Sequence, residues 1–489
     1  MGRAAVTSYY PVLIVGAGPA GLTAAYELVK HGQTAAILEA DPTYVGGIAR
    51  TVEYKGYRFD IGGHRFFSKS EEITNLWQEV LGDDFVTRPR LSRWLYRGRF
   101  FDYPIRPLEI LGLFGPWQSL RMFVSYLNSC LFPIRPEINL ADYYINHFGR
   151  YLARPFFIDY NEKLWGMPCH ELSSDFAQQR VKGISFAGAV LGPIRHKLGL
   201  NGKEVVKSFV SEFRYPRYGP GMMWEAFRDR VVAAGCSLHM DQRVVGLRHD
   251  GRRIVSLLAQ SSTGAQTEYR AEHIISTMPL RELVLALDPP PPADILENAR
   301  GLRLRDFITV ALIVARRDLF PDQWVYLHDT GMKPIRMQNL NNWSPDMVPD
   351  PDTTCLGLEY VCNRGDELWQ MDDRELIAQA TSDLVRTGFA QRQEIVDGAV
   401  VRSLDVYPVY TLDYPQRVAS IRNYLARLNN LLPNHLQPVG RAGMHRYNNS
   451  DHSMMTALLA VRSLLGQGAF DPWSVNADAE YHEESYGKA

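Results

Sequence analysis

The sequence predicts an α/β fold in which a dinucleotide-binding domain is interrupted by a helical insertion and joined to a mixed β-sheet domain. Three observations predict it. Residues 12–40 read as a strand, a glycine turn, a helix and a second strand. Residues 101–213 change to long helical stretches punctuated by prolines, and residues from 307 onward carry the apolar runs typical of strands. A chain of 489 residues is long enough for two or three such domains.

The glycine turn carries the binding chemistry of the first domain. Gly16, Gly18 and Gly21 follow the apolar run 12–15 at the spacing G-x-G-x-x-G. This spacing permits a tight turn, close approach of a pyrophosphate and close packing of helix on strand. The pyrophosphate would lie on the free N–H groups of the helix that opens after the turn. Glu39 ends the second strand 18 residues after Gly21, where a carboxylate binds a ribose hydroxyl and favours an unphosphorylated ribose. The motif alone allows NAD or FAD.

Composition argues against several classes of function. The formal net charge is -1 and no block of Lys and Arg follows a phosphate backbone, so we expect no nucleic acid partner. The five cysteines contain no C-x-x-C pair, which suits buried thiols in a reducing compartment, and we expect no metal site. No second G-x-G-x-x-G is present, so no NAD(P)H site is predicted.

The longest apolar region, residues 108–133, bears on localisation. It is interrupted by Gln118, Arg121 and Asn128 and lacks the ~18 uninterrupted apolar residues of a spanning helix. It is read either as a buried helix or as a face for a partner or a membrane surface. With no signal peptide visible, we expect a cytoplasmic protein without an integral membrane segment.

Two further glycine pairs follow the dinucleotide motif. Gly46, Gly47 and Arg50 form the pattern GG-x-x-R-T, and Gly63 and His64 complete the pattern F-D-x-G-G-H. Together these patterns resemble the flavin-binding amine oxidase clan, which includes protoporphyrinogen oxidase and UDP-galactopyranose mutase, and His64 points toward the mutase branch. The alternative for His64 is an ordinary turn histidine. The resemblance implies FAD, bound in a Rossmann-like domain of the glutathione-reductase/amine-oxidase type, with the glycines and Arg50 in the cofactor site.

The chain after the second glycine pair alternates between the predicted domains. The strand, turn and strand expected at 236–249 resemble the clan's adenine-binding region, with Val244 at the backbone position that pairs with adenine. A buried strand at 274–280 is expected to return to the dinucleotide-binding sheet, and the four prolines at 289–292 form a stiff spacer where we place a domain crossing. We therefore expect an FAD-binding domain of residues 1–100, 214–290 and 420–489, a helical insertion of residues 101–213, and a β-rich substrate domain of residues 291–419.

The helical insertion contains the segment Y-x-x-K-x-W-G-x-x-x-x-E-L, which is similar to a segment of the mutase family. The resemblance implies that Trp165 lies near the substrate and that Arg180 meets its diphosphate, although Arg180 comes one residue later than the family spacing. Trp165 could equally pack between domains.

The β-rich domain supplies two more candidates. Arg336 resembles a family arginine that faces the flavin and the substrate pyrophosphate, with a half-buried structural arginine as the alternative. Tyr407 matches the family's Tyr-Pro pair. An amphipathic helix at 372–388 is expected to cover the sheet.

The last motif is similar to the mutase pattern G-R-x-x-x-x-x-Y-x-D. Gly440, Arg441 and Tyr447 match it, but Asn449 stands at the position of the family's aspartate. The nearest carboxylate is Asp451, which heads the following apolar helix. Gly440 and Asp451 are expected to contribute to the flavin site. The neutral amide leaves the identity of the sugar open.

The leading hypothesis is an FAD-dependent enzyme similar to UDP-galactopyranose mutase. In that family the N5 atom of the reduced flavin attacks the anomeric carbon and displaces the diphosphate while the sugar ring opens and recloses. The substrate would be a nucleotide sugar or glycoside, and a homodimer is a candidate assembly. The alternative is an FAD oxidase or dehydrogenase of the amine oxidase or protoporphyrinogen oxidase type. The predicted catalytic residues are His64, Arg336, Arg441 and Tyr447, and the predicted substrate-binding residues are Trp165, Arg180, Tyr407 and Asn449.

Overall fold

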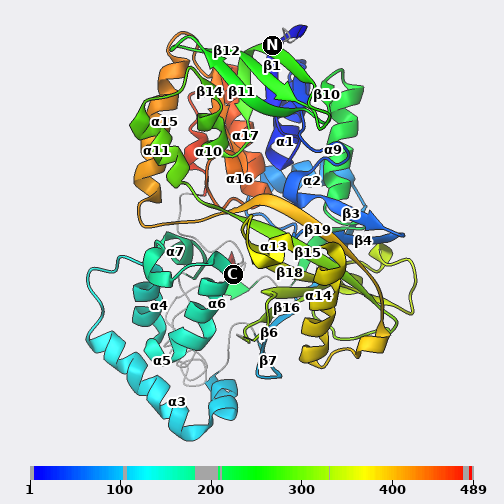
Figure 1. Ribbon diagram of the computed structural model, residues 1–489, viewed down its shortest axis with the longest axis vertical. Helices are drawn as coiled ribbons and strands as arrows, with labels where there is room; N and C mark the ends of the chain where they lie inside the picture. The colour runs from blue at the N-terminus through cyan, green and yellow to red at the C-terminus, as the bar shows by residue number, and fades with distance from the viewer. Residues whose placement is uncertain are drawn as a thin grey trace.

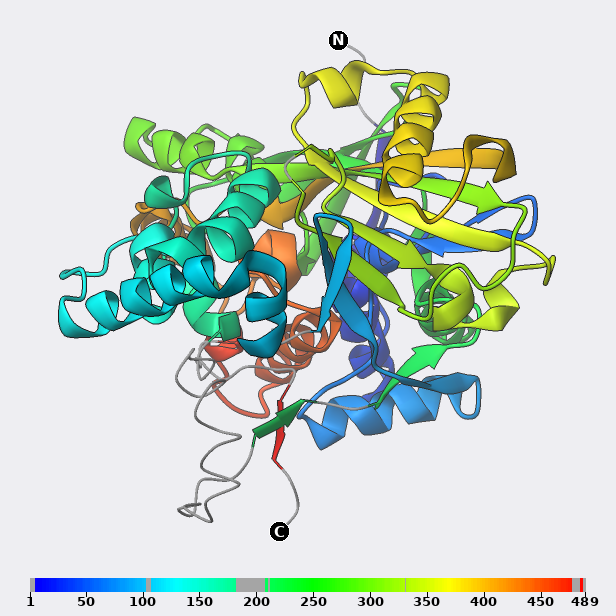
Figure 2. The same ribbon diagram turned by 90° about the horizontal axis from the view of Figure 1, so that it is seen from below.

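A computed structural model describes residues 5–102, 107–181, 207–209, 212–329, 331–476 and 484–486. It contains two large sheets and a group of helices that stands to one side of the second sheet (Figures 1 and 2). The predicted α/β class is confirmed.

The first sheet has the strand order β10-β2-β1-β13-β12-β11-β14, with β20 paired to β13. Its parallel centre forms because β1 is apolar on both faces: Val12 and Ile14 point into one core, and Leu13 and Val15 point into the other. As predicted, β13 returns to this sheet, where it lies parallel to β1. The strands are β1 (Ala5–Val15), β2 (Ala36–Leu38), β10 (Ser237–His239), β11 (Arg243–His249), β12 (Ile254–Gln260), β13 (Gln266–Ser276), β14 (Leu287–Asp288) and β20 (Leu436–Pro438).

Helices cover both faces of the first sheet. The core on one face is formed with α1 (Pro19–Lys30), α2 (Glu71–Leu81), α9 (Gly221–Ala233) and α17 (Ser450–Leu464). The core on the other face is formed with α10 (Leu280–Leu285), α11 (Ala293–Gly301) and α15 (Tyr414–Ala426). The short α16 (Gly440–Gly443) precedes α17. The carboxyl end of β1 and the start of α1 therefore meet at one edge of a fully covered sheet, the usual place for a dinucleotide.

The second sheet has the order β19-β15-β18-β17-β16-β6-β7. The predicted amphipathic helix, α14 (Asp373–Thr387), packs on it through Leu376, Ala380 and Leu384. The strands are β6 (Ser92–Tyr96), β7 (Arg99–Asp102), β15 (Leu304–Val314), β16 (Trp324–Leu327), β17 (Arg336–Asn339), β18 (Thr354–Cys362) and β19 (Ile395–Pro408), and short helices lie at α12 (Leu340–Trp343) and α13 (Glu367–Gln370).

Four elements lie elsewhere than the predicted domain limits imply. Strand β6 and the start of β7 fall before residue 101. Both strands nevertheless extend the second sheet, because β6 pairs in parallel with β16 and buries Trp94 and Leu95 there. After the four prolines, α11 still packs against the first sheet through Ile295 and Ala299, so the chain crosses to the second sheet at β15 and not at residue 291. Helix α15 begins at Tyr414, before the expected limit at 420, because it packs on α11.

The helical insertion contains α3 (Pro107–Leu131), α4 (Leu140–Phe148), α5 (Arg150–Ala153), a π-helical turn at Arg154–Ile158, α6 (Asp159–Trp165) and α7 (Asp175–Val181). Small two-stranded sheets complete the described fold: β3 (Thr51–Tyr54) with β4 (Tyr57–Asp60), β5 (Phe85–Pro89) with β9 (Glu212–Pro216), and β8 (Lys207–Phe209) with β21 (Glu484–Tyr486). In the described part of the chain, no helix is both long and apolar enough to cross a membrane.

Candidate active site

The first glycine motif makes a turn that has no room for side chains. Gly16 has φ +96°, and a Cβ atom there would lie 2.1 Å from Oγ1 of Thr277. A Cβ atom on Gly21 would lie 1.9 Å from the carbonyl oxygen of Gly16. Gly18 precedes α1 without a side-chain cap, so the first N–H groups of that helix are available to an anion.

The second glycine pair faces this turn. A Cβ atom on Gly47 would lie 3.7 Å from the Cα atom of Gly18, and one on Gly46, at φ +96°, would lie 2.9 Å from Trp224. Nε of Arg50 and Nε1 of Trp224 are buried and have no hydrogen-bond partner among the described residues. A glycine-lined turn beside unsatisfied donors fits the pyrophosphate of a dinucleotide cofactor.

Glu39, the residue predicted to bind a ribose hydroxyl, follows β2 directly and lies beside the glycine turn. Its carboxylate is 9% exposed and accepts hydrogen bonds from the N–H groups of Ala17 at 2.6 Å and Asp41 at 2.8 Å. Burial raises its pKa, and these backbone donors oppose the rise. The N–H group of Gln242 donates to the carbonyl oxygen of Glu39, which brings the start of β11, with Val244, close to Glu39.

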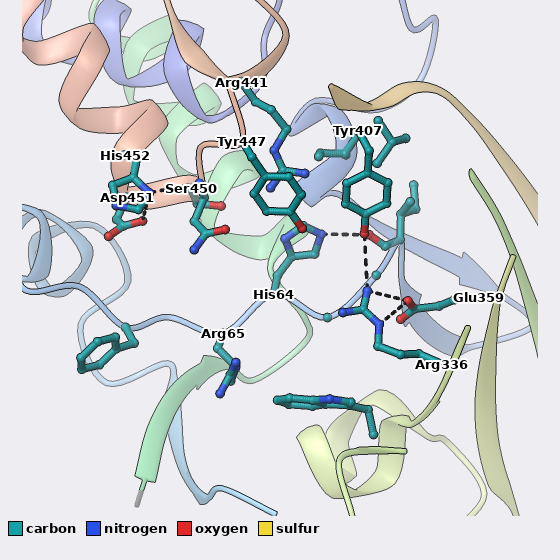
Figure 3. Close-up of a pocket in the computed structure, with 18 of the residues that line it drawn as sticks. His64, Arg65, Arg336, Glu359, Tyr407, Arg441, Tyr447, Ser450, Asp451 and His452 are labelled. Carbon is teal, nitrogen blue, oxygen red and sulfur yellow. Dashed lines mark hydrogen bonds and ion pairs between the residues drawn. The ribbon is translucent and has the colours of Figure 1, made fainter. Parts of the chain in front are cut away.

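A pocket lies between the second sheet and the start of α17, and its side chains converge from distant parts of the chain (Figure 3). Gly63 and His64 come from the F-D-x-G-G-H turn, Arg336 and Glu359 from neighbouring strands, and Tyr407 from the end of β19. The remaining polar lining residues include Arg65, Arg90, Arg441, Tyr447, Asn449, Ser450, Asp451, His452 and Asn476.

Arg336 and Glu359 form a buried ion pair on one wall of the pocket. Nε and Nη2 of Arg336 lie 2.6 and 2.5 Å from Oε2 of Glu359, and the other carboxylate oxygen accepts a 2.8 Å hydrogen bond from Gln338. The two residues are paired opposite each other in β17 and β18. Burial alone would lower the pKa of Arg336, but Glu359 raises it well above its ordinary value, so the guanidinium stays charged. Its side chain is 20% exposed, and that of Glu359 is fully buried.

Two stacked tyrosines and a second arginine form the next wall. The rings of Tyr407 and Tyr447 lie 5.5 Å apart at an interplanar angle of 12°. The guanidinium carbon of Arg441 lies 4.6 Å from the Tyr447 ring centre, and its Nε donates to the carbonyl oxygen of Asn448 at 2.7 Å. Nη2 of Arg336 lies 3.5 Å from the hydroxyl of Tyr407, and burial raises the pKa of that hydroxyl. The guanidinium carbon of Arg441 lies 5.8 Å from the Tyr407 ring centre, so both arginines border the same protonated tyrosine.

His64 is held as a neutral imidazole. Its Nε2 donates to the carbonyl oxygen of Ile61 at 2.9 Å, across the Gly62–Gly63 turn. Burial, together with the positive charges of Arg441 and Arg336, lowers its pKa to about 4. Gly63 lets the turn lie close to α12, because a Cβ atom there would lie 3.2 Å from the Trp343 ring.

The C-terminal motif closes the pocket. Asn449 is the N-cap residue of α17, and its backbone N–H donates to Nδ1 of His452 at 3.2 Å. The cap position therefore belongs to Asn449, while Asp451 lies in the first helical turn and accepts from the hydroxyl of Ser68 at 3.0 Å. Gly440 has φ +82°, and a Cβ atom there would lie 3.1 Å from that of Ala20, so α16 approaches the start of α1.

Two predicted substrate-binding residues are not seen in the pocket. Trp165 is 3% exposed, donates to Asn161 at 3.3 Å and packs edge-on against Tyr407 at 6.3 Å. It is thus behind Tyr407 and not among the lining residues, which agrees with the alternative of packing between domains. Arg180 lies in α7, and its side chain is outside the described part of the chain.

Sequence reasoning missed Glu359 and the arginines Arg65 and Arg90. Glu359 had a usable signal, because a single carboxylate inside the apolar run TCLGLEYVC needs a buried partner. Arg65 directly follows His64, and its guanidinium carbon lies 4.5 Å from the Trp324 ring centre. Among the residues described, no cluster of His, Cys, Asp and Glu could hold a metal ion.

Comparison with known proteins identifies the family of this fold. A family model described as flavin containing amine oxidoreductase matches residues 19–460. A search of curated proteins gives no match. A solved structure of reduced UDP-galactopyranose mutase is 20% identical with a TM-score of 0.79, over 98% of this chain and 100% of that one.

Two other solved structures are similar over nearly their full length. A protein of Exiguobacterium sp. 255-15, provisionally assigned as a protoporphyrinogen oxidase, is 18% identical with a TM-score of 0.68, over 95% of this chain and 100% of that one. A putrescine oxidase bound to putrescine is 15% identical with a TM-score of 0.60, over 94% and 99%. These likenesses concern the fold, and the residues at the glycine turns fit the dinucleotide. The chain therefore belongs to the family of flavin containing amine oxidoreductases, and its cofactor is FAD.

Proposed function

We propose that the protein is an FAD-dependent sugar mutase that interconverts the pyranose and furanose forms of a nucleotide sugar or a related glycoside with an anionic leaving group. The observation that carries this proposal is the charge of the pocket. Four arginines line it, Arg65, Arg90, Arg336 and Arg441, against two carboxylates, Glu359 and Asp451. Since His64 is neutral, the lining favours an anionic substrate.

The same charge argues against an amine substrate. A protonated amine in this pocket would lie near Arg336 and Arg441, and like charges at ~4 Å cost about 4 kcal/mol at an effective dielectric of 20. The carboxylate of Glu359 offers no compensation, because Arg336 and Gln338 already occupy both of its oxygens. A diphosphate would instead bring the negative charge that the pocket lacks.

The two arginines have distinct supports. Glu359 fixes the guanidinium plane of Arg336, so that little side-chain entropy is lost when it binds an anion. Arg441 is held from the other side by the carbonyl oxygen of Asn448 and by the ring of Tyr447. Two guanidinium groups fixed on different elements can bind two phosphate groups, and they stabilise the charge that develops as a diphosphate leaves.

The tyrosines and His64 would position the sugar and the cofactor. When bound, FAD in its reduced form supplies the nucleophile for exchange at the anomeric carbon. The phenols of Tyr407 and Tyr447 can donate hydrogen bonds to sugar or phosphate oxygens. His64, with its pKa lowered to about 4, holds the glycine turn and does not transfer protons at neutral pH. Asn449 adds a neutral amide at the start of α17, so the pocket has one carboxylate fewer than an aspartate would give.

A second candidate is an FAD oxidase or dehydrogenase that acts on an anionic ring compound. The lining favours it in one respect, because Phe67, Phe213, Trp324 and Tyr326 add flat aromatic surface to the pocket. A carboxylated unsaturated ring would use the same arginines.

One experiment separates the two functions. The purified holoenzyme is incubated with nucleotide sugars, first with oxidised flavin and then after reduction by dithionite, and both the sugar isomers and the flavin absorbance are followed. Isomerisation that requires reduced flavin, without net oxidation of the sugar, supports the mutase. Bleaching of the oxidised flavin by substrate, with peroxide formed on reoxidation, refutes it.

A variant links the activity to the pocket. Arg441→Ala should retain FAD and lower kcat/KM by roughly 10²-fold to 10³-fold, the usual cost of one oxyanion-binding donor. Arg417→Ala is a matched control, because Arg417 pairs with Asp413 on α15 and lies outside the pocket lining. Equal kinetics of the two variants would remove Arg441 from the site.

A further inference from the structure

Helix α3 buries only a few of its side chains against the rest of the helical insertion. It packs against α4 and α5 with the buried side chains of Met122 and Ser129. The contact with α5 is close enough to involve backbone, since a Cβ atom on Gly149 would lie 2.6 Å from the backbone nitrogen of Tyr126. Beyond the kink at Gly115, the packed side of α3 is therefore narrow.

Most of the bulky apolar side chains of α3 after the kink at Gly115 point outward. Trp117, Leu120, Val124, Leu127 and Leu131 follow one another at alternating steps of three and four residues, the spacing of one helix face. Their exposed fractions are 70%, 50%, 56%, 42% and 72%. An ordinary surface helix buries such a stripe, and an exposed apolar stripe of this length marks an interaction surface. Figures 1 and 2 show the later part of α3 on the outer edge of the helical insertion. The part before the kink at Gly115 instead meets the second sheet, where Phe114 packs against Tyr96 of β6.

Further exposed side chains extend this surface. Phe123 and Phe132 are 43% and 74% exposed, and Tyr151 on the neighbouring α5 is 49% exposed. We call these three residues, together with the five of the stripe and Arg121, the α3 face.

The charged residues that line a cavity on the α3 face have one sign. This shallow cavity is lined by apolar and neutral polar residues together with Arg121 and Arg150, and no carboxylate is among its lining residues. Arg121 stays at the surface, where its guanidinium donates to the hydroxyl of Tyr151 at 2.9 Å. Arg135 is also exposed, just beyond the end of the helix.

We propose that the α3 face docks on the surface of an anionic phospholipid bilayer, with α3 lying in the interfacial plane. Tryptophan, phenylalanine and leucine on one face with arginine beside them are the composition of interfacial helices. Lipid phosphates would supply the counter-charge for Arg121 and Arg150 that the cavity lining does not provide. Each basic residue near such a surface adds to the attraction. This inference does not depend on the reaction in the pocket.

A second copy of the chain fits the α3 face less well. Pairing two copies through this face would bury Arg121 and Arg150 against a surface that offers no carboxylate among the cavity residues. Unpaired charge in an interface is costly. A bilayer imposes no such penalty, because its headgroups remain hydrated and anionic.

The test measures binding of the holoenzyme to sedimenting vesicles. Vesicles of phosphatidylcholine alone are compared with vesicles that contain phosphatidylcholine and phosphatidylglycerol in equal parts, at low and high salt. We expect binding to the anionic vesicles, weakened at least tenfold by high salt, and little binding to the neutral ones. The double variant Trp117→Ser/Phe132→Ser should lower binding at least tenfold, and Arg121→Ser/Arg150→Ser should remove most of the dependence on salt.

The matched control is Val396→Ser/Leu431→Ser, which removes two side chains exposed at 59% and 52% outside the helical insertion. It should bind vesicles like the unchanged protein. Flavin absorbance and circular dichroism establish that each variant is folded. The proposal is overturned if the unchanged protein ignores anionic vesicles, or if the α3 and control variants bind equally. A second outcome also overturns the proposal: the protein does not bind vesicles, sedimentation in solution shows a dimer, and Trp117→Ser/Phe132→Ser converts this dimer to a monomer. The α3 face would then be occupied by a second copy of the chain.

Discussion

The ion pair between Arg336 and Glu359 gives the most specific prediction, because stability and activity should respond to it in different ways. The carboxylate accepts from Arg336 with one oxygen and from Gln338 with the other. In Glu359→Gln, the amide has only one acceptor oxygen, so one of these two donors faces an NH₂ group. The guanidinium is then left in the pocket wall without its counter-ion.

The size of the effect follows from burial. Removing one partner of a buried ion pair costs about 3 to 5 kcal/mol. Arg336 is 20% exposed, so water relieves part of its charge and we expect the lower end, about 3 kcal/mol. At about 2 °C per kcal/mol for a long chain, the thermal midpoint of the holoenzyme should fall by roughly 6 °C. The double variant Arg336→Met/Glu359→Gln removes the stranded charge and should recover part of this loss.

Activity should not recover with stability. In the proposed mutase, Arg336 binds the leaving diphosphate, so the double variant should stay at least as inactive as the single one. Calorimetry of the FAD-loaded proteins measures the midpoints, and the isomerisation assay measures turnover. If the double variant is no more stable than Glu359→Gln, the two residues are not energetically coupled and this account of the pocket wall is wrong.

Three other predictions follow from the described geometry. Gly21→Ala should purify without flavin, because its Cβ atom would lie 1.9 Å from the carbonyl oxygen of Gly16. The control Gly112→Ala, whose Cβ atom would have nothing within 4 Å, should keep a normal ratio of flavin to protein absorbance. Purification of Gly21→Ala with bound flavin would contradict the assignment of the glycine turn to the cofactor. Burial raises the pKa of Asp60 in the folded protein to about 7 from its ordinary value of 3.8. Between these two pH values the folded state keeps a proton on Asp60 that the unfolded state has released, so the protein loses stability as the pH rises. Asp60→Asn should therefore gain thermal midpoint relative to the unchanged protein as the pH is raised from 4 to 7, and a constant difference would refute the shift. His64→Asn should lower turnover but leave the shape of the pH profile of kcat/KM unchanged between about pH 5 and 9, because neutral His64 does not titrate there. Loss of one limb of the profile in this variant would instead show that His64 acts as an acid or a base.

Local sequence by itself determined the parts of this protein that depend on short-range geometry. The spacing of Gly16, Gly18 and Gly21 after an apolar strand is enough to predict the turn, because only glycine fits where backbone meets backbone. The return of β13 to the first sheet and the amphipathic α14 were equally readable, since strand and helix periods are local. Family motifs added the flavin and brought His64, Arg336, Tyr407, Arg441 and Tyr447 forward as candidates, and all five line one pocket.

Only the tertiary structure decided what those residues contact. The pairing of Arg336 with Glu359 depends on the register of β17 against β18, and β6 joins β16 from more than 200 residues away. Trp165 lies behind Tyr407 because the helical insertion packs as a unit on the end of β19, a contact that no local pattern encodes. The outward stripe of α3 illustrates the same limit. Its spacing predicts a helix with an apolar face, but only packing reveals that this face points away from the core. Short-range geometry depends on neighbouring residues in the sequence, whereas burial, charge pairing and strand register depend on contacts made by the whole fold.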